Sequence, residues 1–249
     1  MLELFKELRL MFKLVCLFMK KYPHVIFSLN KELDKEMIKE FLEYPKKAGM
    51  DFAAEIWEIH PKLKEYYGLK PEEQKALIND YTDSYYIDHS EDLEKAKKSF
   101  QKKWDKVEDN FYMETDKVFN NLFWPEGKYR GFISIITAGP RFLETKEFQS
   151  FYGWEENIIG QAVHEMLHFQ FYNQLSFLKD TITVDEDGIW QLSEIFNDIV
   201  QAEPGFVKIQ GYTPKVSYPE HRELVEKYKK SWDRAQNVSQ FILKSINKK

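Results

Sequence analysis

The sequence predicts an α+β fold that is mostly helical and contains a small mixed sheet. Three observations lead to this prediction. Hydrophobic residues make up 43% of the 249 residues and aromatic residues 16%, which is enough for a sizeable core. Over much of the chain, apolar residues recur every three or four positions, as on one face of a helix. Two short segments, His24 to Leu29 and Gly131 to Thr137, have instead the β-branched and aromatic composition of strands.

The part of the chain before about residue 125 is expected to be mainly helical. After the first strand, Asn30 offers an N-cap for a helix that extends to about Tyr44. Ser90 can cap the longest helix, whose apolar positions run from Leu93 to Phe111. Prolines and glycines separate the helical patterns that lie between these two helices, at about 51–67 and 72–86.

In the second half, the strand at 131–137 ends at Gly139 and Pro140, and Thr181 to Val184 is a candidate for a further short strand. Helices are expected at about 155–172, 190–202 and 220–247. We interpret residues 1–249 as one domain with three parts. They are a helical N-terminal part of about 1–125, a catalytic core of about 130–203 and a C-terminal helical part of about 204–249.

Composition excludes several classes of function. The net charge is −5, so there is no basic surface of the kind that binds nucleic acid. No glycine-rich phosphate loop or dinucleotide fingerprint occurs. Cys16 is the only cysteine, which makes a disulfide framework impossible.

The chain has no run of 18 apolar residues, so no transmembrane helix is predicted. Lys13 interrupts the largely apolar run from Leu10 to Met19, and no small-residue cleavage site follows, which disfavours a signal peptide. Residues 2–20 have the pattern of an amphipathic helix. A surface helix docked on the core is the favoured interpretation, and a helix lying in a membrane interface is the alternative. A cytoplasmic location is therefore expected.

The chemistry concentrates in the segment His164-Glu165-Met166-Leu167-His168. On a helix, residues four apart lie on one face, so the two imidazoles project together and can bind one Zn²⁺. Glu165 lies about 100° around the helix, where a general base for a metal-activated water is expected. The flanking residues are apolar nearly all round the helix, which predicts that it is buried. The alternative is a pair of core histidines with ordinary hydrogen bonds.

A third ligand separates these interpretations, because catalytic zinc sites use three protein ligands and keep one position open. Glu194 and Asp198 lie four residues apart on the predicted helix at 190–202. Glu194 is the candidate ligand. Asp198 could accept the free ring N–H of a ligand histidine and so determine its tautomer. The alternative for this pair is a solvated carboxylate face.

The segment HEMLH, followed by a helical Glu-x-x-x-Asp, resembles the gluzincin metallopeptidases, the clan that includes thermolysin. This resemblance covers about residues 130–200. It implies a zincin-like fold with a buried active-site helix, Zn²⁺ bound by His164, His168 and Glu194, Glu165 as the catalytic base, and Asp198 supporting a ligand histidine. It also implies a strand along the substrate, for which Phe132 to Ala138 is the candidate. The spacing from His168 to Glu194 is longer than is typical of the clan.

The resulting hypothesis is a zinc-dependent hydrolase that cleaves peptide bonds in a peptide or protein substrate. Tyr212, Tyr218 and His221 are the candidates for stabilising the oxyanion. Two alternatives stay open: a zinc hydrolase of another amide or ester, and a helical binding domain with a relic motif. The sequence does not choose between endopeptidase and exopeptidase or predict an oligomeric state. His24, His60 and His89 have no partner at ligand spacing and are expected to be surface or hydrogen-bonded histidines.

Overall fold

The computed structural model describes residues 22–178, 184–235 and 237–246. Its main sheet has four strands in the order β1-β4-β6-β5. Strand β4 pairs in parallel with β1 on one side and with β6 on the other, while β5 is antiparallel to β6. The prediction of a mostly helical α+β fold with a small mixed sheet is therefore confirmed. The strands are β1 (Val25–Leu29), β4 (Tyr129–Ser134), β5 (Arg141–Phe142) and β6 (Glu147–Phe151).

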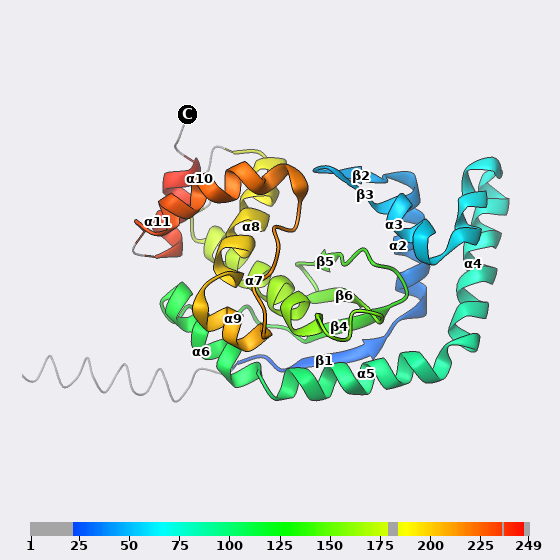
Figure 1. The fold of residues 1–249 in the computed structure, drawn as a ribbon, viewed down its shortest axis with the longest axis horizontal. Coiled ribbons are helices and arrows are strands. Elements are labelled where there is room, and N and C mark those ends of the chain that lie inside the picture. Colours follow the sequence, from blue (N-terminus) through cyan, green and yellow to red (C-terminus); the bar gives the residue numbers. More distant parts are fainter. Residues whose placement is uncertain (1–21, 179–183, 236, 247–249) are drawn as a thin grey trace, which may run out of the picture.

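Helices α2 to α4 and a short hairpin gather at one end of the sheet (Figure 1). As predicted, Asn30 caps the first of these helices, its side chain accepting a bond from Leu33 N at 3.2 Å. The elements are α2 (Lys31–Glu43), strands β2 (Lys46–Lys47) and β3 (Met50–Asp51), α3 (Phe52–Ile59), the 3₁₀ helix η1 (Pro61–Gly68) and α4 (Pro71–Asp88).

The single long helix predicted over 90–111 is wrong, because the structure divides it into α5 (Ser90–Asp105) and α6 (Glu108–Phe119). Val107 N bonds to Trp104 O at 2.9 Å in the turn between them. The turn lets Trp104 and Phe111 both be buried with ring centroids 5.3 Å apart. The apolar periodicity is thus real, but it serves two helices that meet at a bend.

The remaining helices surround the candidate site. The predicted helix at 220–247 is two helices, and a short helix beginning at Pro204 was not predicted. The strand expected at 181–184 lies largely outside the described residues, as do Cys16 and residues 2–20. These elements are α7 (Ile158–Ser176), α8 (Glu186–Gln201), α9 (Pro204–Gln210), the 3₁₀ helix η3 (Pro219–His221), α10 (Arg222–Trp232) and α11 (Val238–Ile246).

Helix α7 is the central element of this half. It packs against the sheet at β6 and against helices α5, α6, α8, α9 and α11 (Figure 1). Most of its residues are buried, including both polar and apolar ones, as its all-round apolar composition predicts. Of the helices described, none combines the length and apolarity needed to cross a membrane.

Gly131, in the middle of β4, is required by the packing of the sheet. A Cβ at this position would lie 2.5 Å from the ring of Phe27 on β1 and 3.0 Å from the ring of Phe148 on β6. These two rings pack edge to face across the glycine, with centroids 6.0 Å apart. The missing side chain therefore lets two aromatic rings cover the centre of the sheet.

We predict that Gly131→Ala lowers the free energy of unfolding by about 1–3 kcal/mol, because the added methyl must displace two buried rings. Gly68→Ala is the matched control, since a Cβ there meets no atom within 4 Å. Urea denaturation of both variants measures the difference. Equal stabilities for the two alanine variants would contradict this account of β4.

A buried carboxylate joins the N-terminal helices to the sheet. Asp34 of α2 accepts hydrogen bonds from Ser134 Oγ at 2.6 Å, Ile135 N at 3.1 Å, Gln149 Nε2 at 2.7 Å and Tyr86 OH at 2.7 Å. Burial raises the pKa of Asp34 to about 6, although these hydrogen bonds oppose the shift. Asp34 thus ties α2 and α4 to the end of β4 and the middle of β6.

The raised pKa of Asp34 makes its ionisation unfavourable for folding. Since the native state holds the proton more tightly than the unfolded chain, stability from this group is lost as the pH rises from about 4 through about 6. We predict that the free energy of unfolding of Asp34→Asn, taken relative to that of wild type, rises by on the order of 3 kcal/mol between pH 4 and pH 7. Denaturation at both pH values measures this, with the exposed Asp88→Asn as control. A pH-independent difference between Asp34→Asn and wild type would refute it.

Candidate functional site

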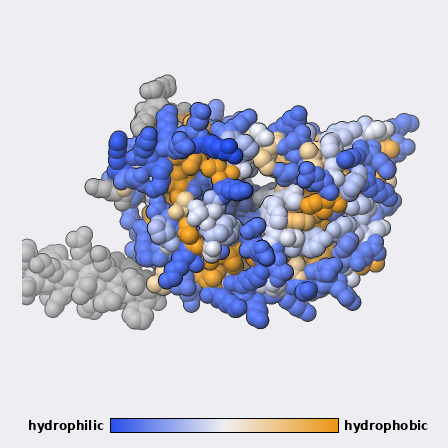
Figure 2. Space-filling model, viewed as in Figure 1, coloured by the Kyte–Doolittle hydropathy of each residue, from blue (hydrophilic) through white to orange (hydrophobic). Residues whose placement is uncertain are grey.

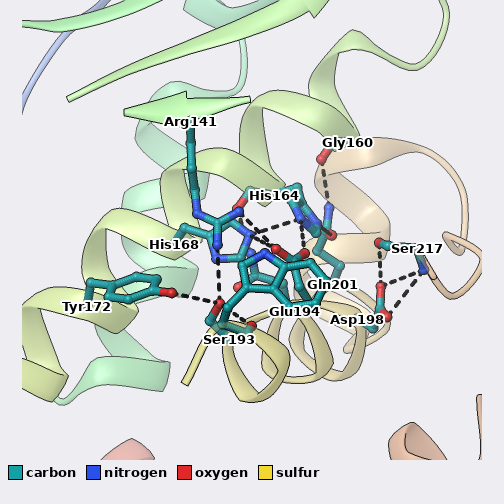
Figure 3. A network of polar contacts seen from close by, with 12 residues as sticks. Arg141, Gly160, His164, His168, Tyr172, Ser193, Glu194, Asp198, Gln201 and Ser217 are labelled. Carbon is teal, nitrogen blue, oxygen red and sulfur yellow. Dashed lines mark hydrogen bonds and ion pairs between the residues drawn. The ribbon is translucent and has the colours of Figure 1, made fainter. Parts of the chain in front are cut away.

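Helices α7 and α8 bring together the three residues predicted as metal ligands (Figure 3). His164 Nε2 lies 3.0 Å from His168 Nε2 and 3.1 Å from Glu194 Oε2. The other oxygen of Glu194 lies 3.4 Å from His168 Nε2. His168 and Glu194 are buried, and His164 is partly exposed. One ligand atom from each residue lies within 4.8 Å of the ligand atoms of the other two, so the three could hold a metal ion.

The distances suit a small divalent cation. Bonds of about 2.0–2.1 Å in tetrahedral geometry place neighbouring ligand atoms roughly 3.3–3.4 Å apart. The two imidazole nitrogens lie 3.0 Å apart, and the nearest Glu194 oxygens lie 3.1 Å (Oε2, from His164) and 3.4 Å (Oε1, from His168) away. Each separation is within a few tenths of an ångström of this value. Two imidazole nitrogens and one carboxylate form a donor set typical of zinc, and three ligands leave one position open.

A side-chain amide on α8 determines which nitrogen of His164 faces the site. Gln201 Nε2 donates to Gly160 O and to Gln210 Oε1, each at 2.7 Å. Gln201 Oε1 is therefore the atom that accepts from His164 Nδ1, at 2.9 Å. This leaves His164 Nε2 directed at His168 and Glu194, the arrangement that a metal-binding histidine needs.

The two imidazoles differ in charge. Burial, reinforced by Arg141, lowers the pKa of His168 to about 3, so this ring is neutral. Burial also opposes a charge on His164, but the hydrogen bond to Glu194 and the charge of Glu165 outweigh it and raise the pKa of His164 to about 9. A metal ion at this position would replace the proton that His164 shares with Glu194.

Glu165 lies beside this group without belonging to it. It is 4% exposed, and its Oε2 has no hydrogen-bond partner within the described residues. Burial raises the pKa of Glu165 to about 7, against the lowering effects of His164 and Arg141. A buried carboxylate with a free oxygen and a pKa near neutrality has the properties of a general base.

Glu194 is contacted by a cation that the sequence did not predict. Arg141 comes from β5 and donates from Nη1 to Glu194 Oε1 at 2.8 Å and from Nη2 to Ser193 Oγ at 3.4 Å (Figure 3). Its guanidinium lies 5.7 Å from the ring centre of Tyr172. Arg141 therefore holds the carboxylate and balances its charge. No sequence signal links Arg141 to Glu194, because they are 53 positions apart and come from different elements.

Asp198 does not make the contact that the resemblance implies. Its carboxylate accepts from Ser217 N at 3.0 and 3.2 Å and from Ser217 Oγ at 2.7 Å. The contact to a ligand histidine comes instead from Gln201, one helical turn farther along α8. Asp198 and Gln201 lie on neighbouring faces of this helix, so a spacing rule alone chose the wrong side chain. The role of Asp198 is to hold the loop that follows α9.

That loop forms one wall of a cavity of about 620 Å³, within the range typical of ligand sites. His164 and Glu165 line the cavity from α7, and Tyr212 and Tyr218 line it from the loop. The opposite wall comes from the N-terminal part of the chain, at Met50, Phe52 and Glu55. Figure 2 shows the surface hollowed between the two ends of the molecule.

The hairpin of β2 and β3 bridges the two walls. Lys47 Nζ lies 4.0 Å from the ring centre of Trp190 on α8, a cation–π contact. At the tip of the hairpin, Gly49 adopts a φ of +83° and lies against Glu220 of η3. The hairpin thereby encloses one side of the cavity.

The prediction that Phe132 to Ala138 forms a strand along the substrate is wrong. Residues Phe132 to Ser134 belong to β4, which pairs on both sides and has no free edge. Only the segment after the strand, Thr137 to Gly139, lines the cavity. The unpaired edge on this side of the sheet belongs to β5.

Of the three residues named as oxyanion candidates, Tyr212 and Tyr218 line the cavity. Burial raises the pKa of Tyr218 well above its ordinary value, so its hydroxyl stays protonated. His221 does not line the cavity; it is fully buried and packs against Tyr218 with ring centroids 5.2 Å apart.

The other histidines have partners, as expected. His60 is buried and bonds through Nδ1 to Tyr81 OH at 2.8 Å and through Nε2 to Ile135 O at 2.7 Å. His24 pairs with Glu108 at the surface. His89 stacks on Tyr85. None of the three belongs to a metal-binding group in the described part of the chain.

No protein family, curated protein or solved structure matches the chain. Any statement about function therefore depends on the geometry and chemistry of this site.

We predict that Gln201→Leu weakens binding of a metal ion at this site, measured with Zn²⁺, about 10- to 100-fold, because the ring of His164 loses the acceptor that orients it. Asp198→Asn should leave zinc affinity within about twofold of wild type, since its partner is the loop and not a ligand histidine. Competition titration with a chromophoric chelator measures both affinities. If Asp198→Asn weakened zinc binding and Gln201→Leu did not, the assignment of the supporting residue would be reversed.

Proposed function

We propose that this chain is a zinc-dependent hydrolase that cleaves peptide bonds. One observation carries the proposal: His164, His168 and Glu194 bring ligand atoms within 4.8 Å of one another, beside a buried Glu165 and at the wall of a cavity. A helical binding domain would have no need to bury two imidazoles and two carboxylates at one position, since unpaired buried polar groups are costly.

In this proposal His164, His168 and Glu194 bind the metal. Zn²⁺ bound there would supply Lewis acidity, the chemistry that activates a carbonyl group and acidifies water. Gln201 keeps the ring of His164 oriented, and Arg141 keeps the carboxylate of Glu194 in place. The residues of the chain thus form a preorganised site before substrate enters.

Glu165 is the proposed general base. Its free Oε2 can take a proton from the attacking water, and the resulting carboxylic acid can pass it to the leaving amine. Because burial raises its pKa to about 7, the side chain can exchange a proton in both directions near neutral pH. Its place in the cavity wall, adjacent to His164, supports this role.

Tyr218 is our candidate for stabilising the oxyanion. Its partly buried hydroxyl remains a donor, and it lines the same cavity as Glu165. The bond between Asp198 and Ser217 supports the loop directly before Tyr218. Tyr212 is the second candidate; its hydroxyl lies directly against Gly160, near the start of α7.

We favour peptides as substrates because the cavity is lined by residues from both halves of the chain and is hollowed at the surface, as an extended substrate requires. In this view the N-terminal part forms the far wall of the site and the whole chain works as one unit. Hydrolysis of a non-peptide amide or ester is the competing function, and it requires the same metal and base.

The test combines metal analysis with a peptide library. The wild-type chain should bind one Zn²⁺ and cleave peptides. Glu165→Gln should bind zinc equally well, and its kcat/KM should fall by about 10²- to 10⁴-fold. His168→Ala should lose both properties, and His24→Ala, at an exposed histidine outside the site, should keep both.

Two outcomes would count against the proposal. Sustained peptide cleavage by Glu165→Gln would remove this residue as the base. Zinc binding without cleavage of any peptide, together with turnover of ester or small-amide substrates, would favour the competing function.

A further inference from the structure

The cavity contains a second carboxylate, on the wall opposite Glu165. Glu55 of α3 and Glu165 of α7 are the acidic side chains among the described residues that line it. The proposed mechanism uses Glu165 and leaves Glu55 without a task. The inference below rests on the proposed function, because it concerns what the same cavity binds.

The negative charge of Glu55 has few neutralising partners in the structure. It is partly buried, and its hydrogen bond is a long one of 3.5 Å from Thr137 Oγ1. Within the part of the chain that the structure describes, Glu55 forms no ion pair. Burial raises the pKa of Glu55, and the charges of Glu58 and Asp51 add to this effect. A partly desolvated carboxylate beside like charges attracts a cation from outside.

The nearby lysines are unsuited to this role. Lys47 lies over the ring of Trp190. Lys215, the lysine of the cavity lining, is exposed on the loop of the opposite wall and is not paired with Glu55. The carboxylate therefore faces a space that substrate, and not a side chain of the described structure, can fill.

Aromatic rings accompany this carboxylate in the lining. Phe52 lies on the same wall as Glu55, and Trp154, Tyr212 and Tyr218 complete the aromatic part of the cavity. Such rings accommodate the aliphatic stem of a long basic side chain and attract a cation over their faces. Carboxylate and aromatic rings together make a site for a group that is apolar along its length and charged at its end.

We propose that Glu55 binds a positively charged group of the substrate, an alkylammonium or a guanidinium, and so selects peptides with a basic group near the scissile bond. Lysine or arginine side chains and a free N-terminal amine share this chemistry. Glu55 is then a specificity-determining residue across the cavity from the metal-binding group.

The test measures binding without turnover. Zinc-loaded Glu165→Gln is titrated by calorimetry with an acetylated, amidated pentapeptide that contains one arginine, and with its counterpart that contains citrulline, a neutral isostere. The same neutral peptide with a free N-terminus provides the second cationic source. We expect a cationic form to bind about tenfold more tightly than the neutral one, the scale of a charge-assisted hydrogen bond.

Substitutions at position 55 identify the residue responsible. Adding Glu55→Gln should reduce the preference to about onefold, and Glu55→Asp should retain part of it. Glu58→Gln is the matched control, because it removes the same charge from an exposed position of the same helix, outside the cavity. Melting temperatures confirm that each variant is folded.

The outcomes separate this inference from the proposed function. Cleavage of peptides by wild type without any charge preference overturns the role of Glu55 and leaves the hydrolase proposal standing. A preference for the cationic peptide that Glu55→Gln removes, without cleavage by wild type, supports Glu55 and contradicts peptidase activity. Failure of every peptide to bind, or a preference that persists in Glu55→Gln, overturns the inference.

Discussion

The packing of α8 against α7 is the constraint on which the site depends. It brings a carboxylate onto two imidazoles in a largely buried region, where a polar group without a partner is costly. Glu194, Asn197 and Gln201 all project from one side of α8 towards α7, and the amide of Asn197 donates to His164 O at 2.7 Å. Three polar contacts along one helix face therefore determine the register between the two helices.

Charge balance accounts for much of the surrounding architecture. Glu194 could not be buried beside Glu165 without a cation, and Arg141 supplies one from the short edge strand β5. The sheet is held in turn by Asp34, which reaches the end of β4 and the middle of β6 from α2. The N-terminal helices, which form the far wall of the cavity, are thus connected through a buried carboxylate to the half that carries the candidate metal site.

The sequence predicted the local features well because each has a local cause. Asn30 caps its helix through a bond to the nearby Leu33. The spacing of His164 and His168 places both rings on one face whatever surrounds them. The bend at Val107 was missed, since apolar periodicity continues through it and only the packing of buried rings requires it. Asp198 was assigned to a histidine on its spacing, although its carboxylate meets the loop at Ser217.

The sequence by itself therefore determined the fold class, the helix that bears the histidines and the choice of Glu194 as the third member of the group. These follow from periodicity, capping and residue spacing, which act over a few positions. Only the tertiary structure decided that Gln201 orients His164, that Arg141 neutralises Glu194 and that Glu55 faces the same cavity. These contacts join residues far apart in the chain, and the burial that makes each of them necessary exists only once the helices and the sheet have packed.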